Sequence, residues 1–289
     1  MQLSTPETFA RLQREAAILV RVEATEGSVP RAAGTCMLVF AAAPGATGDD
    51  ALAGTIGGGQ LEFQAIAQAR AWLAGGPPPV GGGTQRYALG PSLGQCCGGV
   101  VHLRYERVEA GQGDAVAARL AQGLPPVALF GGGHVGKALV QALAPLPFAL
   151  TWIDSRDEIF PVQVPPGVRC EHSDPVQAAV AGLAAGSQVL VMSFSHAEDL
   201  DIVAACLRRQ RERGDLPFVG LIGSKTKWAT FRHRLEHRGF AAAEIAHVTC
   251  PIGIPGITGK EPAVIAAGVA AQLLLRRSAS PGAPGGSGA

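Results

Sequence analysis

Two adjacent cysteines, Cys96 and Cys97, lie in a glycine-rich stretch at residues 94–99. Glycine on both sides allows the thiols and nearby backbone N–H groups to approach a ligand closely. A deprotonated thiol binds soft transition metals and attacks sulfur, so the pattern favours soft-metal or sulfur chemistry. A buried pair that fills a small gap is the competing interpretation, because free cysteine often packs as a small apolar side chain.

A glycine-rich turn at residues 131–136 reads G-x-G-x-x-G, directly after a β-rich run and before a helical pattern. Such a turn lets helix N-terminal amides meet a phosphate, as in dinucleotide-binding folds. Asp154 ends the next expected strand, where its carboxylate would accept hydrogen bonds from ribose hydroxyls. The turn would equally hold another phosphate, or bind no nucleotide. The candidate cofactor-binding residues here are Gly131, Gly133, His134, Gly136 and Asp154.

Three glycine-bearing turns divide the first part of the chain: residues 27–34, residues 54–60 and the loop that contains the cysteines. The second turn leads into a helical pattern, so its backbone N–H groups could hold an anion. The turns would form a polar-edged pocket if they converged, and three ordinary hairpin turns fit the spacing equally well. The candidate cofactor-binding residues in the second turn are Gly57, Gly58, Gly59 and Gln60.

His196 and Asp199 lie one helical turn apart, just after the expected strand at residues 189–194. Open α/β sheets bind their ligands at this carboxyl edge. A capping box explains the local pattern equally well, because Ser195 would cap the following helix and Glu198, three residues on, would return the hydrogen bond.

Two further residues each allow two interpretations. Lys225 opens another expected helix, where its charge could balance a cofactor phosphate or could simply be solvated. Cys250, just before Pro251, is a third candidate thiol, and a buried cysteine at the end of a strand is the alternative.

The second half of the chain alternates β-rich runs with helical patterns, which implies a parallel sheet wrapped by helices. The first part mixes strand candidates with one helical pattern at residues 61–73, which suggests a small α+β unit. We therefore expect an α/β protein in which a small N-terminal α+β domain precedes a Rossmann-like, doubly wound parallel-sheet domain. The expected strands are residues 17–22, 36–41, 100–105, 127–130, 149–153, 189–194 and 218–222. Three later helices are expected: one that begins at Val135, one that ends near Gln210 and one over residues 228–237.

Composition divides the chain into four segments. We expect an N-terminal domain over residues 1–108, a linker with a brief helix over 109–126, the Rossmann-like domain over 127–277 and a disordered tail over 278–289. The tail contains only Ser, Ala, Gly and Pro, which cannot bury apolar area. Residues 44–51 and 75–84 are expected surface loops of the first domain.

The 289 residues are 47% apolar and carry a formal net charge of +1, with basic residues scattered along the chain. This composition predicts a globular protein and gives no electrostatic basis for binding nucleic acid or an anionic membrane. The first residues do not read as a secretory leader, so we expect a cytoplasmic protein. Its six cysteines would then be reduced, and their spacing does not predict a structural zinc site.

Taken together, the motifs resemble the XdhC/CoxI family of xanthine dehydrogenase accessory proteins. Gln60 stands where the CoxI-type branch of that family usually shows cysteine, which places the chain nearer the XdhC branch. The matching stretches are residues 27–31, 34–39, 54–62, 95–99, 129–136, 153–156, 220–225 and 250–253.

The resemblance implies a chaperone for the molybdenum cofactor rather than an enzyme, with no catalytic residue. Members of the family bind this cofactor, protect it while a separate cysteine desulfurase replaces an oxo ligand with sulfido, and deliver it to the molybdenum subunit of xanthine dehydrogenase. The resemblance favours the plain molybdopterin form and a homodimer. Cys97, with Cys96 as second choice, would then lie beside the molybdenum or the incoming sulfur, and residues 57–59 or 131–136 would hold the phosphate.

Two enzyme classes compete with this interpretation. An NAD(P)-dependent oxidoreductase would use the turn at residues 131–136, with His134 or His196 as an acid, but it leaves the cysteine pair unexplained. A sulfurtransferase would form a persulfide on Cys97. The chain shows no pyridoxal-binding lysine motif with which to generate that sulfur, so it would still need a donor.

Overall fold

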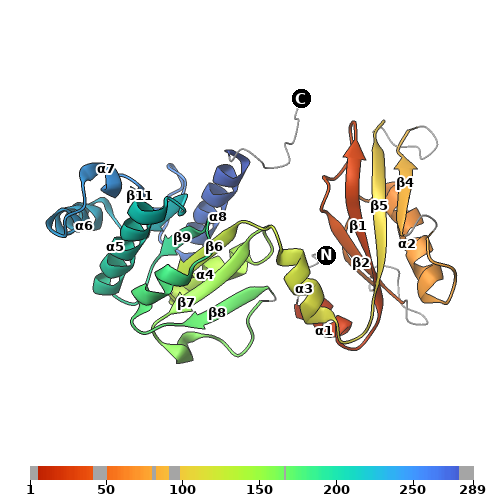
Figure 1. Cartoon of the computed structure of the whole chain (residues 1–289), viewed down its shortest axis with the longest axis horizontal. Coiled ribbons are helices and arrows are strands. Elements are labelled where there is room, and N and C mark those ends of the chain that lie inside the picture. The colour runs from red at the N-terminus through yellow and green to blue at the C-terminus, as the bar shows by residue number, and fades with distance from the viewer. Residues whose placement is uncertain (1–5, 42–50, 80–82, 91–97, 166, 280–289) are drawn as a thin grey trace. The chain divides into compact units, whose positions relative to one another are not determined.

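The computed structural model describes residues 6–41, 51–79, 83–90, 98–165 and 167–279, so Cys96 and Cys97 lie outside the described residues. The chain divides into two compact units, and the division falls between Leu120 and Ala121 (Figure 1). It lies within the expected linker, where residues Gly113–Ala121 form helix α3. Each unit has its own core and is described separately.

The N-terminal unit is built on a five-stranded antiparallel sheet with the order β3-β2-β1-β5-β4. Its strands are β1 (Ala17–Glu26), β2 (Cys36–Phe40), β3 (Leu52–Gly54), β4 (Thr84–Ala88) and β5 (Val100–Val108), and its other helices are α1 (Pro6–Leu12) and α2 (Gly59–Leu73).

Alternation along β1 gives this sheet a core on each face. Ile18 and Val20 pack with Leu61 and Ala65 of α2, whereas Leu19, between them, packs on the opposite face with residues of α1 and α3. The sheet therefore holds α2, and the glycine turn that begins it, in a fixed position.

The C-terminal unit is a six-stranded parallel sheet with the order β11-β10-β9-β6-β7-β8. Its strands are β6 (Pro126–Phe130), β7 (Ala149–Asp154), β8 (Val168–His172), β9 (Gln188–Val191), β10 (Phe218–Leu221) and β11 (Val248–Thr249). Its helices are α4 (His134–Leu143), α5 (His196–Arg213), α6 (Lys225–His237), α7 (Ala242–Ile245) and α8 (Pro262–Ala279), with short 3-10 helices η3 (Asp157–Ile159) and η4 (Val176–Gly182).

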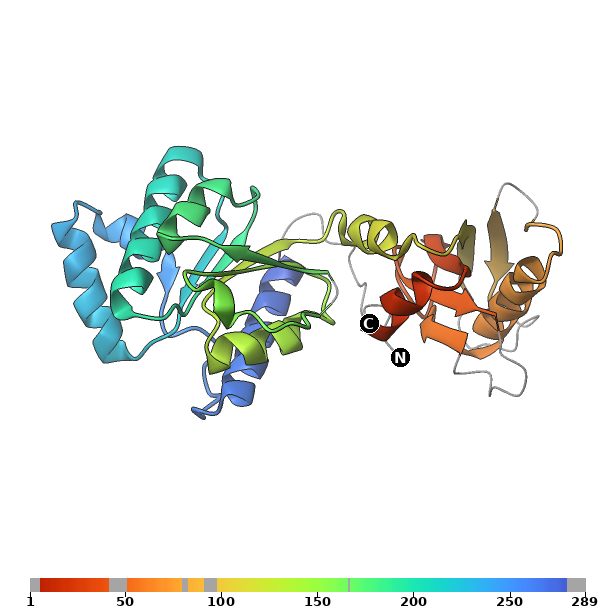
Figure 2. The same ribbon diagram turned by 90° about the horizontal axis from the view of Figure 1, so that it is seen from below.

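Helices cover both faces of this parallel sheet, as expected for a doubly wound fold (Figure 2). Leu129 of β6 packs against α4 and α8, whereas Phe130, the next residue, packs on the other face with α5 and α6. The chain runs from β6 to β7 and β8 on one side and then crosses back to β9 on the other. The carboxyl ends of β6 and β9 therefore form the topological switch point, where such sheets bind ligands.

Apart from the 18-residue helix α8, the elements that the sequence pattern does not predict are short or lie at the edge of a sheet, and some expected elements have other bounds. Strand β4 begins at Thr84, inside the expected loop at residues 75–84, and its side chains are only exposed or half-buried, so no apolar run marks it. The strand expected at residues 189–194 ends at Val191. Helix α8 continues to Ala279, two residues into the expected tail. The pattern also misses β3, β8, β11, α1, α7 and α8.

Candidate functional site

In the turn at residues 131–136, close packing excludes a side chain at Gly131 and Gly136, whereas the space beside Gly133 is open. Gly131 has a φ of +124°, and a Cβ there would clash with the carbonyl oxygen of Met192. A Cβ on Gly136 would clash with the carbonyl oxygen of Gly131. Gly133, the N-cap of α4, has nothing within 4 Å of its missing Cβ and is exposed with His134. The turn can therefore receive a ligand at Gly133.

Beneath the turn, the indole N–H of Trp152 donates to the carbonyl oxygen of Gly131 at 2.9 Å. Trp152 is 1% exposed, and its ring meets Phe160 edge-on with 5.3 Å between centroids. This buried hydrogen bond fixes the orientation of the first peptide of the turn.

The carboxylate of Asp154 is 2% exposed and is used within the protein. It accepts the N–H of Gly132 at 2.6 Å, the backbone N–H of Arg156 at 3.0 Å, and the guanidinium Nε and Nη2 of Arg156 at 2.9 and 3.1 Å. Burial raises the pKa of this carboxyl, but the hydrogen bonds from Arg156 and Gly132 together hold the pKa below its usual value. A carboxylate offers about four lone-pair positions, so a ribose hydroxyl would have to displace Arg156.

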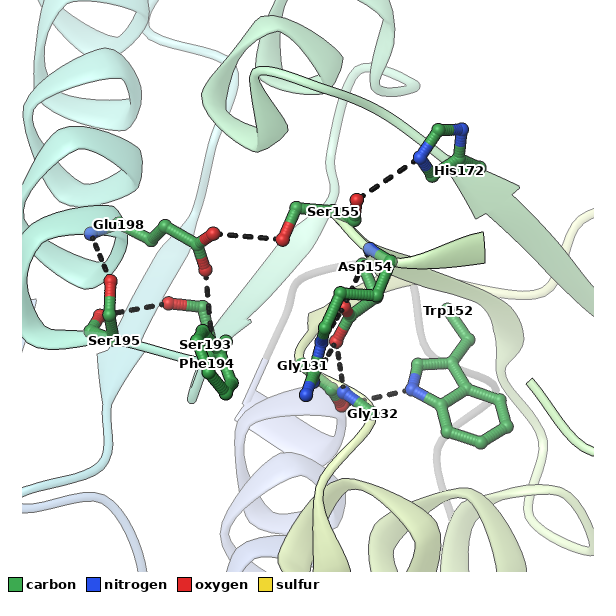
Figure 3. A network of polar contacts seen from close by, with 11 residues as sticks. Gly131, Gly132, Trp152, Asp154, Ser155, His172, Ser193, Phe194, Ser195 and Glu198 are labelled. Carbon is green, nitrogen blue, oxygen red and sulfur yellow. Dashed lines mark hydrogen bonds and ion pairs between the residues drawn. The ribbon is translucent and has the colours of Figure 1, made fainter. Parts of the chain in front are cut away.

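Arg156 connects this carboxylate to an exposed aromatic ring that the sequence reasoning missed. Its guanidinium carbon lies 4.4 Å from the centroid of Phe194, which is 68% exposed. The N–H of Phe194 donates to Glu198 at 3.2 Å, and the hydroxyl of Ser155 donates to the same carboxylate at 2.8 Å (Figure 3). These contacts join the segments that follow β7 and β9. In the sequence pattern Phe194 is the last residue of the strand expected at residues 189–194, so nothing marks it as an exposed ring.

The start of α5 confirms one half of the predicted capping box and contradicts the other. Ser195 is the N-cap, and its Oγ accepts the N–H of Glu198 at 3.2 Å. The Glu198 carboxylate does not return to Ser195 but accepts from Phe194 and Ser155, because the neighbouring segment after β7 supplies a hydroxyl donor. His196 is exposed and lies edge-on to Phe231.

A buried ion pair lies at the carboxyl ends of β9 and β10. The Nζ of Lys227 is 2.6 Å from the Oδ2 of Asp199 and also donates to the carbonyl oxygen of Ile222 at 2.9 Å. The other Asp199 oxygen accepts the N–H and the hydroxyl of Ser193 at 2.7 and 2.8 Å. Lys225, the lysine that the sequence suggested, is instead exposed at the start of α6. Ser224 caps this helix through the backbone N–H of Lys227, which does not distinguish the side chain of Lys227 from that of Lys225 in the sequence.

The cysteines that the structure describes are not thiolates at neutral pH. Burial raises the pKa of the Cys36 and Cys250 thiols to about 11 and that of Cys206 to about 12, and it also raises the pKa of Cys170. Among the described residues, no group of three or more metal-binding side chains converges. The soft-metal prediction for Cys97 and Cys96 stays a prediction, because both residues lie outside the described ranges.

In the N-terminal unit, the Glu62 carboxylate accepts hydrogen bonds from backbone amides of the turn that the sequence predicts as a phosphate site. Gly57, Gly58 and Gly59 all have positive φ. Oε2 of Glu62 accepts the N–H of Ile56 at 2.9 Å and of Gly58 at 3.1 Å, together with the hydroxyl of Thr55. Glu62 thus fills the anion position inside the turn, while Gly59 and Gln60 remain exposed in the first turn of α2.

Among the described residues, the turn at residues 27–34 meets the other two glycine-bearing segments. A Cβ on Gly57 would lie 2.8 Å from the ring of Pro30, and the N–H of Gly99 donates to the carbonyl oxygen of Ser28 at 3.1 Å. The described end of the cysteine-containing segment is therefore attached to the same turn as Gly57.

Comparison with known proteins matches both units. A model described as the XdhC Rossmann domain matches residues 127–273, and a model of the XdhC and CoxI family matches residues 10–88. The uncharacterized protein YqeB of Escherichia coli (strain K12) is 26% identical over 266 residues, which cover 91% of this chain and 44% of that protein. The chain thus spans less than half the length of that curated relative.

A solved structure from Bacillus halodurans, described as a xanthine dehydrogenase, has the same fold. Its TM-score is 0.64 at 18% sequence identity, over 99% of this chain and 98% of that chain. No helix in the described ranges is long and apolar enough to cross a membrane.

Proposed function

This chain belongs to the XdhC and CoxI family, and from that membership we propose that it assists the maturation of xanthine dehydrogenase. The finer proposal is that it binds the molybdenum cofactor, holds it while a separate cysteine desulfurase exchanges oxo for sulfido, and delivers it to the molybdenum subunit. The observation that carries this proposal is the family match across both units.

The turn at residues 131–136 is suited to the phosphate of this cargo. The cofactor is an anionic pterin with a terminal phosphate, a dithiolene and an oxygen-sensitive metal. Gly133 is open, and the α4 N-terminus behind it has no acidic residue in its first turn, so its free N–H groups favour an anion. We propose that Gly133 and His134 contact the phosphate, in preference to Gly57–Gly59, whose turn already holds the Glu62 carboxylate.

We propose Cys97, with Cys96 as second choice, for the metal end of the cargo. The cargo's molybdenum is a metal for which thiolates are suitable soft ligands. The four described cysteines have raised pKa values and are poor candidates for this role. In this proposal the protein is a carrier without catalytic residues, its cargo is the plain molybdopterin form, and it acts as a homodimer.

An NAD(P)-dependent oxidoreductase is the second candidate, because the glycine turn is of the dinucleotide-binding type. The occupied carboxylate of Asp154 weighs against it, since the acid expected to bind ribose hydroxyls is 2% exposed and bonded to Arg156.

The test is the molybdenum and pterin content per chain after anaerobic incubation with free molybdenum cofactor and removal of unbound ligand. The wild type, Cys97→Ala and the matched control Cys170→Ala are compared. Near-stoichiometric retention by the wild type and the control, with loss in Cys97→Ala, is the expected result. No retention by folded wild type would contradict the carrier function, and nicotinamide nucleotide binding would then be measured.

A further inference from the structure

We infer that Phe194 is a stacking platform for the planar heteroaromatic ring of the cargo, and that Arg156, which lies over the other face of Phe194, holds the platform in place. The inference rests on the proposed function, because the ring of that cargo is a pterin. It assigns a binding role to Phe194, which follows β9, and a positioning role to Arg156, which follows β7.

Phe194 is exposed, and hydrogen bonds hold the backbone that carries it. With 68% of the residue accessible, the ring lies outside the core. Its N–H donates to Glu198 at 3.2 Å, and the preceding Ser193 is held by two hydrogen bonds to Asp199 at 2.7 and 2.8 Å. An aromatic ring presented in this way offers contact area to a ligand while little conformational freedom remains to be lost on binding.

Arg156 lies over one face of that ring, so a ligand would stack on the face that Arg156 leaves open. Its guanidinium carbon lies 4.4 Å from the ring centroid, and its side chain is 28% exposed. A guanidinium has five N–H donors, of which Nε and one on Nη2 go to Asp154. The other three N–H groups have no acceptor among the residues that the structure describes. They stay available to an acceptor oxygen of the cargo that lies beside the platform, not to a ring on the opposite face of Phe194.

The platform lies beside the glycine turn. In the sheet, β6 has β9 on one side and β7 on the other, so the segments carrying Phe194 and Arg156 flank the turn that follows β6. Asp154 accepts the N–H of Gly132 (Figure 3). It also accepts the guanidinium of Arg156, so one carboxylate positions the turn and the platform together. A ligand with a planar ring and a phosphate arm would meet both features at the switch point.

The test is a fluorescence titration of the full chain with 6-hydroxymethylpterin, a pterin without phosphate or metal. Phe194→Ala should weaken its binding about tenfold, which is typical for loss of one aromatic stacking partner. Phe194→Trp should restore binding. The matched control is Phe63→Ala, because Phe63 is 67% exposed and lies in the N-terminal unit. The thermal unfolding midpoint should stay unchanged in these variants.

Equal pterin affinity of Phe194→Ala and wild type, or an equal loss in Phe63→Ala, would overturn the platform. Displacement of the pterin by adenosine monophosphate at lower concentration than by pterin itself would overturn the choice of ring. The carrier function can fail independently of the platform. If the wild type retains no intact cofactor but binds the free pterin through Phe194, the carrier function is refuted and the platform stands. Intact cofactor retention with unchanged pterin binding by Phe194→Ala would refute the platform and keep the carrier.

Discussion

The Nζ of Lys227 and the Oδ2 of Asp199 lie 2.6 Å apart, with the two side chains 12% and 3% exposed. This pair connects α6 to α5 at the carboxyl edge of the sheet. The same Asp199 holds Ser193 and thereby the turn that carries Phe194. The contribution of the Lys227–Asp199 pair to stability can be separated from that of Lys225, the exposed lysine two residues earlier.

Lys227→Met should lower the free energy of unfolding by about 3–5 kcal/mol, because it leaves the buried Asp199 carboxylate without its cation. Lys225→Met, at an exposed position, should change it by less than about 0.5 kcal/mol. Urea unfolding of the two variants measures the difference. Equal destabilisation by both substitutions would contradict the buried-pair assignment.

Substitution of the glycines in the turn should separate folding from binding. Gly136→Ala should destabilise the protein by more than about 3 kcal/mol, because its Cβ would clash with the Gly131 carbonyl. Gly133→Ala has open space and a φ of −69°, so it should cost no more than about 1 kcal/mol. The same Cβ would stand where the cargo phosphate approaches, so retained pterin should fall. Full retention by folded Gly133→Ala would place the phosphate elsewhere.

Asp154 should make the free energy of unfolding depend on pH. Its pKa in the folded protein lies below the value of about 3.9 in unfolded chains, so the ionised carboxylate stabilises the fold above that pH. This contribution is lost as the pH falls through the folded-state pKa. The difference in unfolding free energy between wild type and Asp154→Asn should therefore shrink as the pH is lowered from neutral to roughly pH 3. Urea unfolding of both proteins at each pH measures this difference. A difference independent of pH would refute this role.

Alkylation should distinguish the cysteine pair from the other thiols. At pH 8, iodoacetamide should label Cys96 and Cys97 before the described cysteines, because burial raises the pKa values of Cys36, Cys206 and Cys250 to about 11, 12 and 11. Peptide mass spectrometry after short reaction times gives the order. Earlier labelling of Cys206, which is 0% exposed, would contradict the packing of α5.

Glu62→Gln should destabilise the N-terminal unit by about 1–3 kcal/mol, because the amide replaces a charged acceptor of the N–H groups of Ile56 and Gly58. Gln60→Ala, an exposed change on the same helix, is the control. Urea unfolding followed by the fluorescence of Trp72, in the same helix, reports on this unit when Trp152 and Trp228 are replaced by phenylalanine in both variants and in the reference protein. An unchanged midpoint for Glu62→Gln would show that the internal carboxylate is dispensable.

The sequence could predict the elements whose signals are local. The apolar runs of β6 and β7, with the glycine spacing between them, predict a Rossmann-like sheet, and Ser195 followed by Glu198 predicts a helix cap. The partners of these residues depend on tertiary structure. Asp154 was expected to face a ribose, but the fold places Arg156 against it, and Glu198 bonds to Ser155, 43 positions away.

Other features had no sequence signal of their own. Strand β4 lies at the edge of its sheet with no buried residue, so alternation is absent. Lys227 and Lys225 are indistinguishable by composition, and only the direction in which α6 leaves the sheet turns Lys227 inward. The importance of Phe194 follows from its neighbours on other segments, which a pattern along one segment does not contain.

The hydrogen bond from Trp152 to Gly131 gives the glycine turn an optical probe of its own. An indole 1% exposed to water emits at shorter wavelength than a solvated one, and its emission depends on the carbonyl to which it donates. A ligand that shifts the Gly131 peptide should therefore change the colour or the lifetime of this emission. Replacing Trp72 and Trp228 by phenylalanine would leave Trp152 as the one emitter, so that cargo loading and release could be followed in real time without a label.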